Sequence, residues 1–357
     1  MYLKHLRITN FKNISSFDED FAAINCFVGD NGVGKTNILD SIHYLSFCKS
    51  YFGQNDLDSI KKGEDFFSIN GLYEGNGTTE SYICALQKNG KKTIRHSDKV
   101  YQRHSDHIGK LPAVIITPND HCLIGGSSEL RRKFIDIAVS QQDKLYLKTL
   151  IRYNKAVAQR NRMLKDCKLR GCLDMISLQI TEEQIARHAE EIQRKRKEFF
   201  VDFATPFSTY YSHISGDKEE VSIEYKTYDG NLSNILLQNR DRDLAVGYTT
   251  TGIHKDDLLF CLSQNPIKTF GSQGQQKTYL LALKLAQFDY LCNKLKEKPI
   301  LMIDDIFDKL DFNRVNTLLQ LMKKEQFGQV FITDTHPDRI ERLIDGALKE
   351  KTKIFRL

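Results

Sequence analysis

The chain has 357 residues and a formal net charge of +6, with 40% hydrophobic residues, eight cysteines and no tryptophan. Six prolines and 21 glycines are too few for a linker-rich or collagenous chain, and the apolar content is sufficient for a folded core. Its longest apolar runs, such as Ala113 to Ile116, fall far short of the about 20 residues that a membrane helix needs. Because Met1 to Leu6 also lacks the apolar stretch of a secretory signal, we expect a cytoplasmic protein with no membrane partner.

The positive charge is concentrated in the middle of the chain. Arg131 to Glu198 holds 17 Lys or Arg against 9 Asp or Glu, a net of +8 in 68 residues, whereas the other 289 residues have a net of −2. A basic block on a nearly neutral chain suggests a polyanionic partner such as nucleic acid. A solvated helical face is the commoner reason for a run of charge, so both interpretations stay open here.

The eight cysteines are scattered, and none forms a Cys-x-x-Cys pair or a Cys/His cluster with zinc-ligand spacing. We therefore expect buried, reduced thiols of a cytosolic protein.

The first 125 residues are predicted to be rich in β-strands. Leu3–Thr9 alternates at period two, and Ala22–Val28 is a short apolar run that ends at a glycine. The same reasoning predicts further strands at Phe66–Tyr73, Ser81–Gln87 and Pro112–Thr117.

A helical segment follows. From Ser127 to about Tyr211 apolar residues recur at helical spacing, and Gly171 is expected to separate two long helices of an antiparallel arm. Three further strands are predicted at Val221–Thr227, Gly247–Thr250 and Leu258–Leu262. A long helix from Gly274 to about Leu295 and a buried strand at Pro299–Ile303 complete the pattern. This order predicts an α/β fold, in which residues 1–125 and 216–357 form one head of mixed β-sheets and helices, and residues 126–215 form an inserted helical arm.

Gly29 to Thr36 reads GDNGVGKT and matches the phosphate-loop pattern G-x-x-x-x-G-K-[ST]. The loop follows a predicted strand and opens a predicted helix, where backbone N–H groups can surround phosphate oxygens. Lys35 would reach the β- and γ-phosphates, and the Thr36 hydroxyl would ligate Mg²⁺. A glycine turn that precedes Lys-Thr by chance is the alternative, but the strand–loop–helix context favours ATP or GTP binding. The predicted ATP-binding residues are Gly29, Asp30, Asn31, Gly32, Val33, Gly34, Lys35 and Thr36.

A second half of the site is predicted about 270 residues later. Ile300 to Asp305 reads ILMIDD, four apolar residues that run into two aspartates, as in a buried parallel strand that ends at the edge of a sheet. Asp304 would hold Mg²⁺ through water, and Asp305 would polarise the attacking water. An aspartate pair that merely caps the next helix is the alternative reading.

Ser272 to Gln276 reads SQGQQ and opens a helix about 30 residues before the two aspartates. A hydroxyl and free N–H groups at a helix N-terminus form an anion-binding device. Because the chain already has a phosphate loop, we expect this second phosphate-binding element to act across a dimer, on the γ-phosphate bound by the other subunit. The residues predicted to act in trans are Ser272, Gln273, Gly274 and Gln275, and the same interface is predicted to include Leu310 and Asp311.

The order of these motifs resembles that of ABC-type ATPase heads, including the SMC group. Several segments are similar to the RecF family of DNA-repair ATPases in particular. They lie across most of the chain at compatible spacing: Leu6–Asn13, Ile116–Pro118, Gly125–Gly126 with Arg131–Asp136, Gly252–Leu258, and Gln273–Lys277.

This resemblance implies an ATP-dependent dimer that binds DNA, particularly duplex next to single-stranded gaps, and works with RecO and RecR to load recombinase. It also implies a weak, DNA-dependent ATPase in which ATP closes the dimer on DNA and hydrolysis reopens it. Most ABC-type heads have a glutamate at the position of Asp305, and the shorter carboxylate agrees with slow turnover.

Two other functions share these motifs: the ATPase subunit of another machine, such as a membrane transporter, and a nucleotide-binding structural protein without turnover. The basic arm favours the DNA-binding ATPase, because a transporter's helical subdomain has no general reason to be basic. No base-reading motif is evident, so binding should be directed at the DNA backbone. The candidate DNA contacts are Arg131, Arg132, Lys133, Arg194, Lys195, Arg196 and Lys197.

Overall fold

The computed structural model describes residues 1–53, 55–75, 77–171, 174–216, 219–305, 314, 320, 327–337 and 346–357. The chain divides into two compact units, each built from separate stretches of sequence. The first, which we call the head unit, comprises Met1–Asp120, Tyr210–Gly216 and Lys277–Leu357. The second, the arm unit, comprises His121–Thr209 and Asp217–Gln276.

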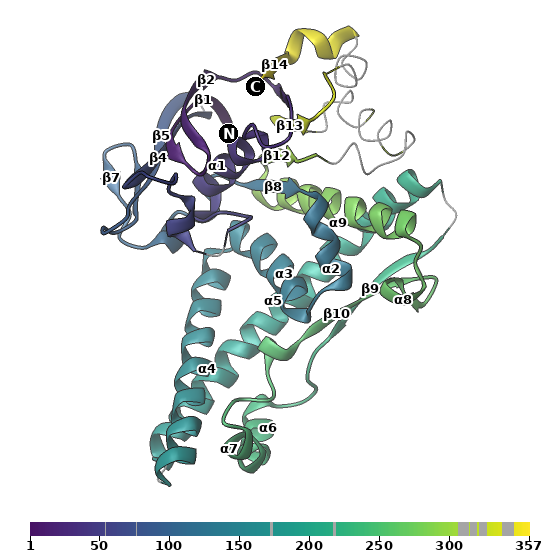
Figure 1. Ribbon diagram of the computed structural model, residues 1–357. Coiled ribbons are helices and arrows are strands. Elements are labelled where there is room, and N and C mark those ends of the chain that lie inside the picture. Colours follow the sequence, from purple (N-terminus) through teal and green to yellow (C-terminus); the bar gives the residue numbers. More distant parts are fainter. Residues whose placement is uncertain are drawn as a thin grey trace. The chain divides into compact units, whose positions relative to one another are not determined.

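The head unit contains a six-stranded antiparallel sheet in the order β2-β1-β4-β5-β6-β7 (Figure 1). Its strands are β1 (Tyr2–Phe11), β2 (Ile14–Asp20), β4 (Phe66–Gly75), β5 (Thr78–Gln87), β6 (Thr93–His96) and β7 (Lys99–Val100). In β1 a register shift between Leu3 and His5 lets Leu3 and Leu6 both face the core, although their odd spacing would otherwise place them on opposite faces.

The head unit also contains a five-stranded parallel sheet in the order β14-β3-β13-β12-β8. Its strands are β14 (Thr352–Arg356), β3 (Ile24–Val28), β13 (Val330–Asp334), β12 (Ile300–Ile303) and β8 (Ala113–Ile116). Residues of β3, β8, β12 and β13 are buried throughout, which explains why these strands are nearly continuous apolar runs in the sequence. The predicted strands at Ala22–Val28, Pro112–Thr117 and Pro299–Ile303 are confirmed.

Two helices of the head unit meet these sheets. Helix α1 (Lys35–Phe47) buries Ile38, Leu39 and Ile42 in the core shared with the six-stranded sheet. Helix α9 (Gln273–Leu295) begins in the arm unit and buries most of its remaining length in the head unit. Its buried Lys284 lies 2.9 Å from the carboxylate of Asp120, just after β8, and donates to the Ile115 carbonyl.

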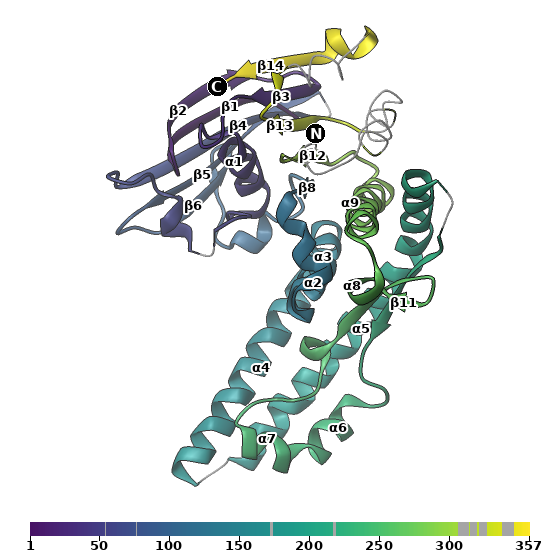
Figure 2. The same cartoon turned by 45° about the vertical axis from the view of Figure 1, so that its right-hand side comes forward.

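The arm unit is mainly helical, with α2 (Cys122–Gly125), α3 (Ser128–Gln142), α4 (Lys144–Arg170), α5 (Met175–Ser215), α6 (Leu232–Gln238), α7 (Arg240–Val246) and α8 (Ile267–Phe270). Helices α4 and α5 run antiparallel beside each other (Figure 2), and the last residues of α5 belong to the head unit. Gly171 ends α4 in the left-handed conformation, with φ of 71°. The predicted helical hairpin is therefore confirmed.

The structure differs from the predicted domain boundaries after Gly216. Residues 217–276, which we expected in the head, belong to the arm unit and form their own sheet of β9 (Val221–Lys226), β10 (Asp257–Leu262) and β11 (Asn265–Pro266). The predicted strand at Gly247–Thr250 is absent, because Gly247 is the left-handed cap of α7.

The structure also tests two expectations from composition, namely buried cysteine thiols and the lack of a membrane-spanning helix. Cys26, Cys48, Cys84 and Cys261 are buried free thiols, but Cys122 is exposed, so the prediction of uniformly buried cysteines is wrong. No described helix has both the length and the apolar character of a membrane span.

Candidate functional site

The loop between β3 and α1 has a backbone shape that requires glycine. Gly32 and Gly34 adopt φ values of 87° and 114°, which side-chain-bearing residues rarely adopt. A Cβ atom at Gly34 would also lie 3.1 Å from the Oδ1 atom of Asn13. The predicted phosphate loop therefore has local structure that its glycine spacing explains.

Lys35 is the first residue of α1 and is largely buried. Its ammonium group donates hydrogen bonds to the carbonyl oxygens of Gly29, at 2.6 Å, and Asp30, at 2.8 Å. The side chain therefore lies back along the loop. Both acceptors are neutral, and Lys35 forms no ion pair within 4.0 Å among the described residues, so its positive charge remains available to a phosphate group.

The structure brings Thr36 and Asp304 into direct contact. Asp304 directly follows β12, and its Oδ1 atom accepts hydrogen bonds from the hydroxyl groups of Thr36 and Thr333, both at 2.8 Å. Burial raises the pKa of Asp304, and the two hydroxyl donors oppose that rise. The two halves of the site, 268 residues apart in sequence, thus meet as the motifs predict.

Asp305 has two unusual features at the same position. Its backbone is left-handed, with φ of 43°, and its N–H donates to the Thr333 hydroxyl at 2.9 Å. Its Oδ1 atom is buried and has no hydrogen-bond partner among the described residues. Strained backbone and an unsatisfied buried acceptor are both costly, and such features concentrate at functional sites.

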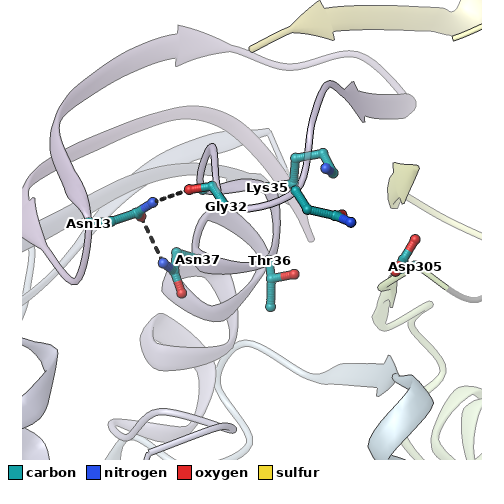
Figure 3. Close-up of a pocket in the computed structure, with 8 residues that line it drawn as sticks. Asn13, Gly32, Lys35, Thr36, Asn37 and Asp305 are labelled. Atoms are coloured by element: carbon teal, nitrogen blue, oxygen red, sulfur yellow. Dashed lines mark hydrogen bonds between the residues drawn. The ribbon is translucent and has the colours of Figure 1, made fainter. Parts of the chain in front are cut away.

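A pocket opens between the loop and Asp305, which lies opposite Lys35 and Thr36 (Figure 3). It is lined by Asn13, Asn31, Gly32, Gly34, Lys35, Thr36, Asn37 and Asp305. Thr36, Asp304 and Asp305 offer only oxygen donors, the ligands that Mg²⁺ prefers, and one of these oxygens lacks any other partner. The residues present therefore fit a magnesium ion.

Sequence reasoning missed two contributors to this site: Asn13, which lines the pocket, and Thr333, which contacts both aspartates. Asn13, in the turn between β1 and β2, donates to the Gly32 carbonyl at 2.9 Å and accepts from Asn37 at 2.7 Å (Figure 3). Thr333, on β13, bridges Asp304 and Asp305. Asn13 is the last residue of the family-like segment Leu6–Asn13, and this resemblance was the only feature of the sequence that could have indicated a role for it. Nothing in the sequence shows that β13 lies beside β12.

Ser272 and Gln275 form a reciprocal cap at the start of α9. The Gln275 N–H donates to the Ser272 hydroxyl at 3.2 Å, and the Ser272 N–H donates to the Gln275 side chain at 2.6 Å. The capping geometry explains why the helix starts here. The role of Ser272–Gln275 across a dimer stays a prediction, and Leu310 and Asp311 lie outside the described residues.

Three of the candidate DNA contacts are held in the arm unit's own interactions. Arg131 binds both carboxylate oxygens of Asp257, at 2.7 and 3.0 Å, and Arg132 donates to the Asp256 carbonyl at 2.7 Å. Arg196 is buried and pairs with Asp136 at 2.9 Å and Asp256 at 2.8 Å. The structure therefore contradicts the prediction for Arg196, whose guanidinium group cannot reach a DNA phosphate without leaving its carboxylates.

The other four candidates are more exposed. Arg194 pairs with Glu191 at 2.6 Å, and Lys195 pairs with Asp143 at 2.9 Å, whereas Lys133 and Lys197 are exposed. Whether any of them contacts DNA stays a prediction.

Comparison with known proteins places this architecture in a family. Residues 2–349 match the family described as "RecF/RecN/SMC N terminal domain". A protein named "DNA replication and repair protein RecF", from Flavobacterium johnsoniae, is 46% identical over 360 residues that cover all of both chains. The chain belongs to the RecF family. A RecF from Bacteroides thetaiotaomicron is 45% identical, over 100% of this chain and 97% of that protein.

Solved structures agree with the RecF assignment. A structure titled "Structure of the recombination mediator protein RecF-ATPrS in RecFOR pathway" has a TM-score of 0.88 and 28% identity, over 100% of this chain and 96% of that one. An SMC head bound to the winged-helix domain of ScpA has a TM-score of 0.58 at 14% identity, over 100% of this chain and 94% of that chain, which shows the fold alone. The predicted class, a head of ABC type with mixed sheets and helices, is confirmed.

Proposed function

We propose that the chain is an ATP-binding DNA replication and repair protein that hydrolyses ATP at the loop Gly29–Thr36. The observation that carries this proposal is the contact between the Thr36 hydroxyl and the Asp304 carboxylate, beside a lysine that lies along the loop. Two kinds of likeness support it: the RecF relatives are named for DNA replication and repair, and the similar solved structures are titled RecF-ATPrS and RecF-ATP.

The residues have distinct chemical roles in this proposal. Lys35 would exchange its two carbonyl acceptors for oxygens of the β- and γ-phosphates, and Thr36 with Asp304 would hold Mg²⁺. When bound, Mg²⁺ supplies charge neutralisation at the phosphate oxygens. The unpartnered oxygen of Asp305 would accept a hydrogen bond from the attacking water and orient it toward the γ-phosphate.

The proposed dimer places the start of α9 of one subunit on the nucleotide of its partner. Ser272, Gln273, Gly274 and Gln275 would then contact the γ-phosphate in trans, and Leu310 with Asp311 would line the interface. Because this arrangement exists only with ATP bound, ATP would close the dimer and slow hydrolysis would reopen it. DNA, particularly duplex beside a gap, would be the ligand whose release this switch controls, with RecO- and RecR-like proteins as partners in the cytoplasm.

The test combines DNA binding and sedimentation of the full chain with ATP, with ADP and without nucleotide, on duplex, gapped and single-stranded DNA. Lys35→Ala should abolish ATP-dependent dimerisation while its circular dichroism stays that of the unaltered chain. Lys62→Ala, at an exposed lysine of the head unit outside the pocket, is the matched control. Dimerisation that persists in Lys35→Ala contradicts the shared-site model. Tight ATP binding with no hydrolysis would instead indicate a structural nucleotide-binding protein.

A further inference from the structure

The positive charge of the central block lies on one helix. Helix α4 contains nine Lys or Arg and a single Asp, a net charge of +8. Helix α5 contains five basic and six acidic residues, and α3 contains three basic and two acidic residues. The whole net charge of the 68-residue block is thus equal to that of α4 alone, which the count along the sequence could not show.

Four of these cations follow one exposed face of α4. Along this face the positions advance by four, three, four and three residues, which is the spacing of a straight stripe on an α-helix. We call the four cations the α4 stripe: Lys148, Arg152, Lys155 and Arg162, with Gln159 between the last two; all five side chains are exposed. The opposite face is buried through Tyr146, Tyr153, Val157 and Leu164.

The stripe is not neutralised by the fold. Within the part of the chain that the structure describes, Lys148, Arg152 and Lys155 have no carboxylate partner within 4.0 Å. Arg162 approaches Asp166 only at 3.9 Å, and its side chain is 86% exposed. Burial, and after it the charges of Arg187 and Arg152, lowers the pKa of His188 on α5.

Arg160, between the stripe residues in sequence, is the internal contrast. It is fully buried, with Glu182 at 2.9 Å, Asp243 at 2.6 Å and the Thr249 hydroxyl at 2.9 Å. The fold therefore provides carboxylate partners for Arg160, which points inward from α4, whereas the stripe cations point outward and are left exposed to solvent.

We propose that the α4 stripe binds the sugar-phosphate backbone of duplex DNA, an inference that rests on the proposed function and identifies its DNA-contacting surface. From Lys148 to Arg162 the helix rises about 21 Å, since each residue contributes about 1.5 Å. Duplex DNA carries one negative charge per about 1.7 Å of its axis, so all four cations can face phosphates at once. The stripe contains no aromatic residue on which a base could stack, and its contacts are therefore independent of sequence.

The test compares two variants of the full chain that each lose four positive charges. The stripe variant is Lys148→Gln, Arg152→Gln, Lys155→Gln and Arg162→Gln. The control variant removes four cations that already pair with carboxylates and are not among the candidate DNA contacts: Lys4→Gln, Arg7→Gln, Lys226→Gln and Lys353→Gln. Affinity for a short duplex is measured by fluorescence anisotropy between about 50 and 200 mM salt, the range in which counterion release is resolved.

The stripe variant should reduce the magnitude of the slope of log affinity against log salt by about 3.6, because each of the four lost phosphate contacts contributes about 0.9. The control variant should change the slope by less than about 1, and both variants should bind ATP as the unaltered chain does. The double variant Arg152→Gln and Lys155→Gln should lower the slope by about 2, which gives a second measurement with less perturbation of the helix.

An unchanged slope in the stripe variants, or an equal loss in the control, would overturn the inference while leaving the proposed function intact. Failure of the unaltered chain to bind duplex DNA with or without ATP would overturn both.

Discussion

Arg196→Gln should unfold the arm unit more easily rather than act directly on a DNA contact. The guanidinium group of Arg196 lies in the interior of the arm unit, where it donates to Asp256 at 2.8 Å, the Ile253 carbonyl at 3.0 Å and Asp136 at 2.9 Å. Glutamine is polar but carries no positive charge. The substitution therefore leaves the buried carboxylate of Asp256 without its cation.

The size of the effect follows from what remains around Asp256. Removal of one partner from a buried ion pair typically costs about 3–5 kcal/mol. The hydroxyl groups of Tyr225 and Thr227 would still donate to Asp256, and burial already raises the pKa of this carboxyl group, which eases its protonation. We therefore expect a loss near the lower end of that range, about 3 kcal/mol of unfolding free energy.

Urea unfolding followed by far-ultraviolet circular dichroism measures this loss. Arg194→Gln is the control, because Arg194 is two residues away on the same helix but its side chain is 52% exposed and pairs only with surface glutamates. Its cost should stay within about 0.5 kcal/mol. Equal, small effects of Arg196→Gln and Arg194→Gln would refute the assignment of Arg196 to the interior.

Three further predictions concern the head unit and the dependence of stability on pH. Asn13→Ala should weaken ATP binding several-fold in calorimetry and leave the urea midpoint nearly unchanged, because it frees the Gly32 carbonyl at the pocket; unchanged affinity would contradict this role. Lys284→Met should cost about 3 kcal/mol of unfolding free energy, because it leaves the buried carboxylate of Asp120 without its cation. Adding Asp120→Asn should restore part of this loss. A double variant as unstable as Lys284→Met alone would argue against the Lys284–Asp120 ion pair. Burial lowers the pKa of His43, His107 and His254 from 6.5 to about 4, so below pH 6.5 the folded chain keeps them neutral while the unfolded chain protonates them. Their contribution to the free energy of unfolding is therefore complete above pH 6.5 and is lost as the pH decreases toward 4. A urea midpoint that is the same at about pH 7 and about pH 5 would disprove this contribution.

The phosphate loop was predictable because its signal is local. Glycines at positions 32 and 34 supply the positive φ values that the loop needs, and Lys35 follows them directly in sequence. Asp304 was predictable for a related reason, since four buried apolar residues of β12 run straight into it. Both predictions depended on adjacent residues, which sequence patterns represent well.

The charged segments were less predictable, because a run of residues says little about which of them face solvent. Arg194, Lys195, Arg196 and Lys197 are consecutive, yet the helical turn of 3.6 residues directs Arg196 into the interior and Arg194 outward. The exposed cations of α4 are separated by three or four residues and so form no visible cluster in the sequence. Clustering along the chain therefore directed the prediction to α3 and α5, whereas the exposed α4 stripe has its cations spread over about four turns.

Long-range pairing accounts for the remaining differences. The strands of residues 217–276 were expected in the head, but β9 and β10 pair with each other in a separate sheet and belong to the arm unit. Thr333 contacts Asp304 only because β12 and β13 are neighbours in the parallel sheet. Neither pairing has a signature in the residues themselves.

The order of strands in the parallel sheet has a consequence for synthesis on the ribosome. β3, at residues 24–28, pairs with β13 on one side and β14 on the other, so it must wait for residues 330–356 before its hydrogen bonds are complete. The six-stranded antiparallel sheet, in contrast, lies entirely within the first 100 residues and can pair early. We therefore expect the nascent chain to carry a folded antiparallel sheet beside an unpaired, apolar β3 until translation is nearly finished. During this interval the chain is most exposed to aggregation and most dependent on chaperones.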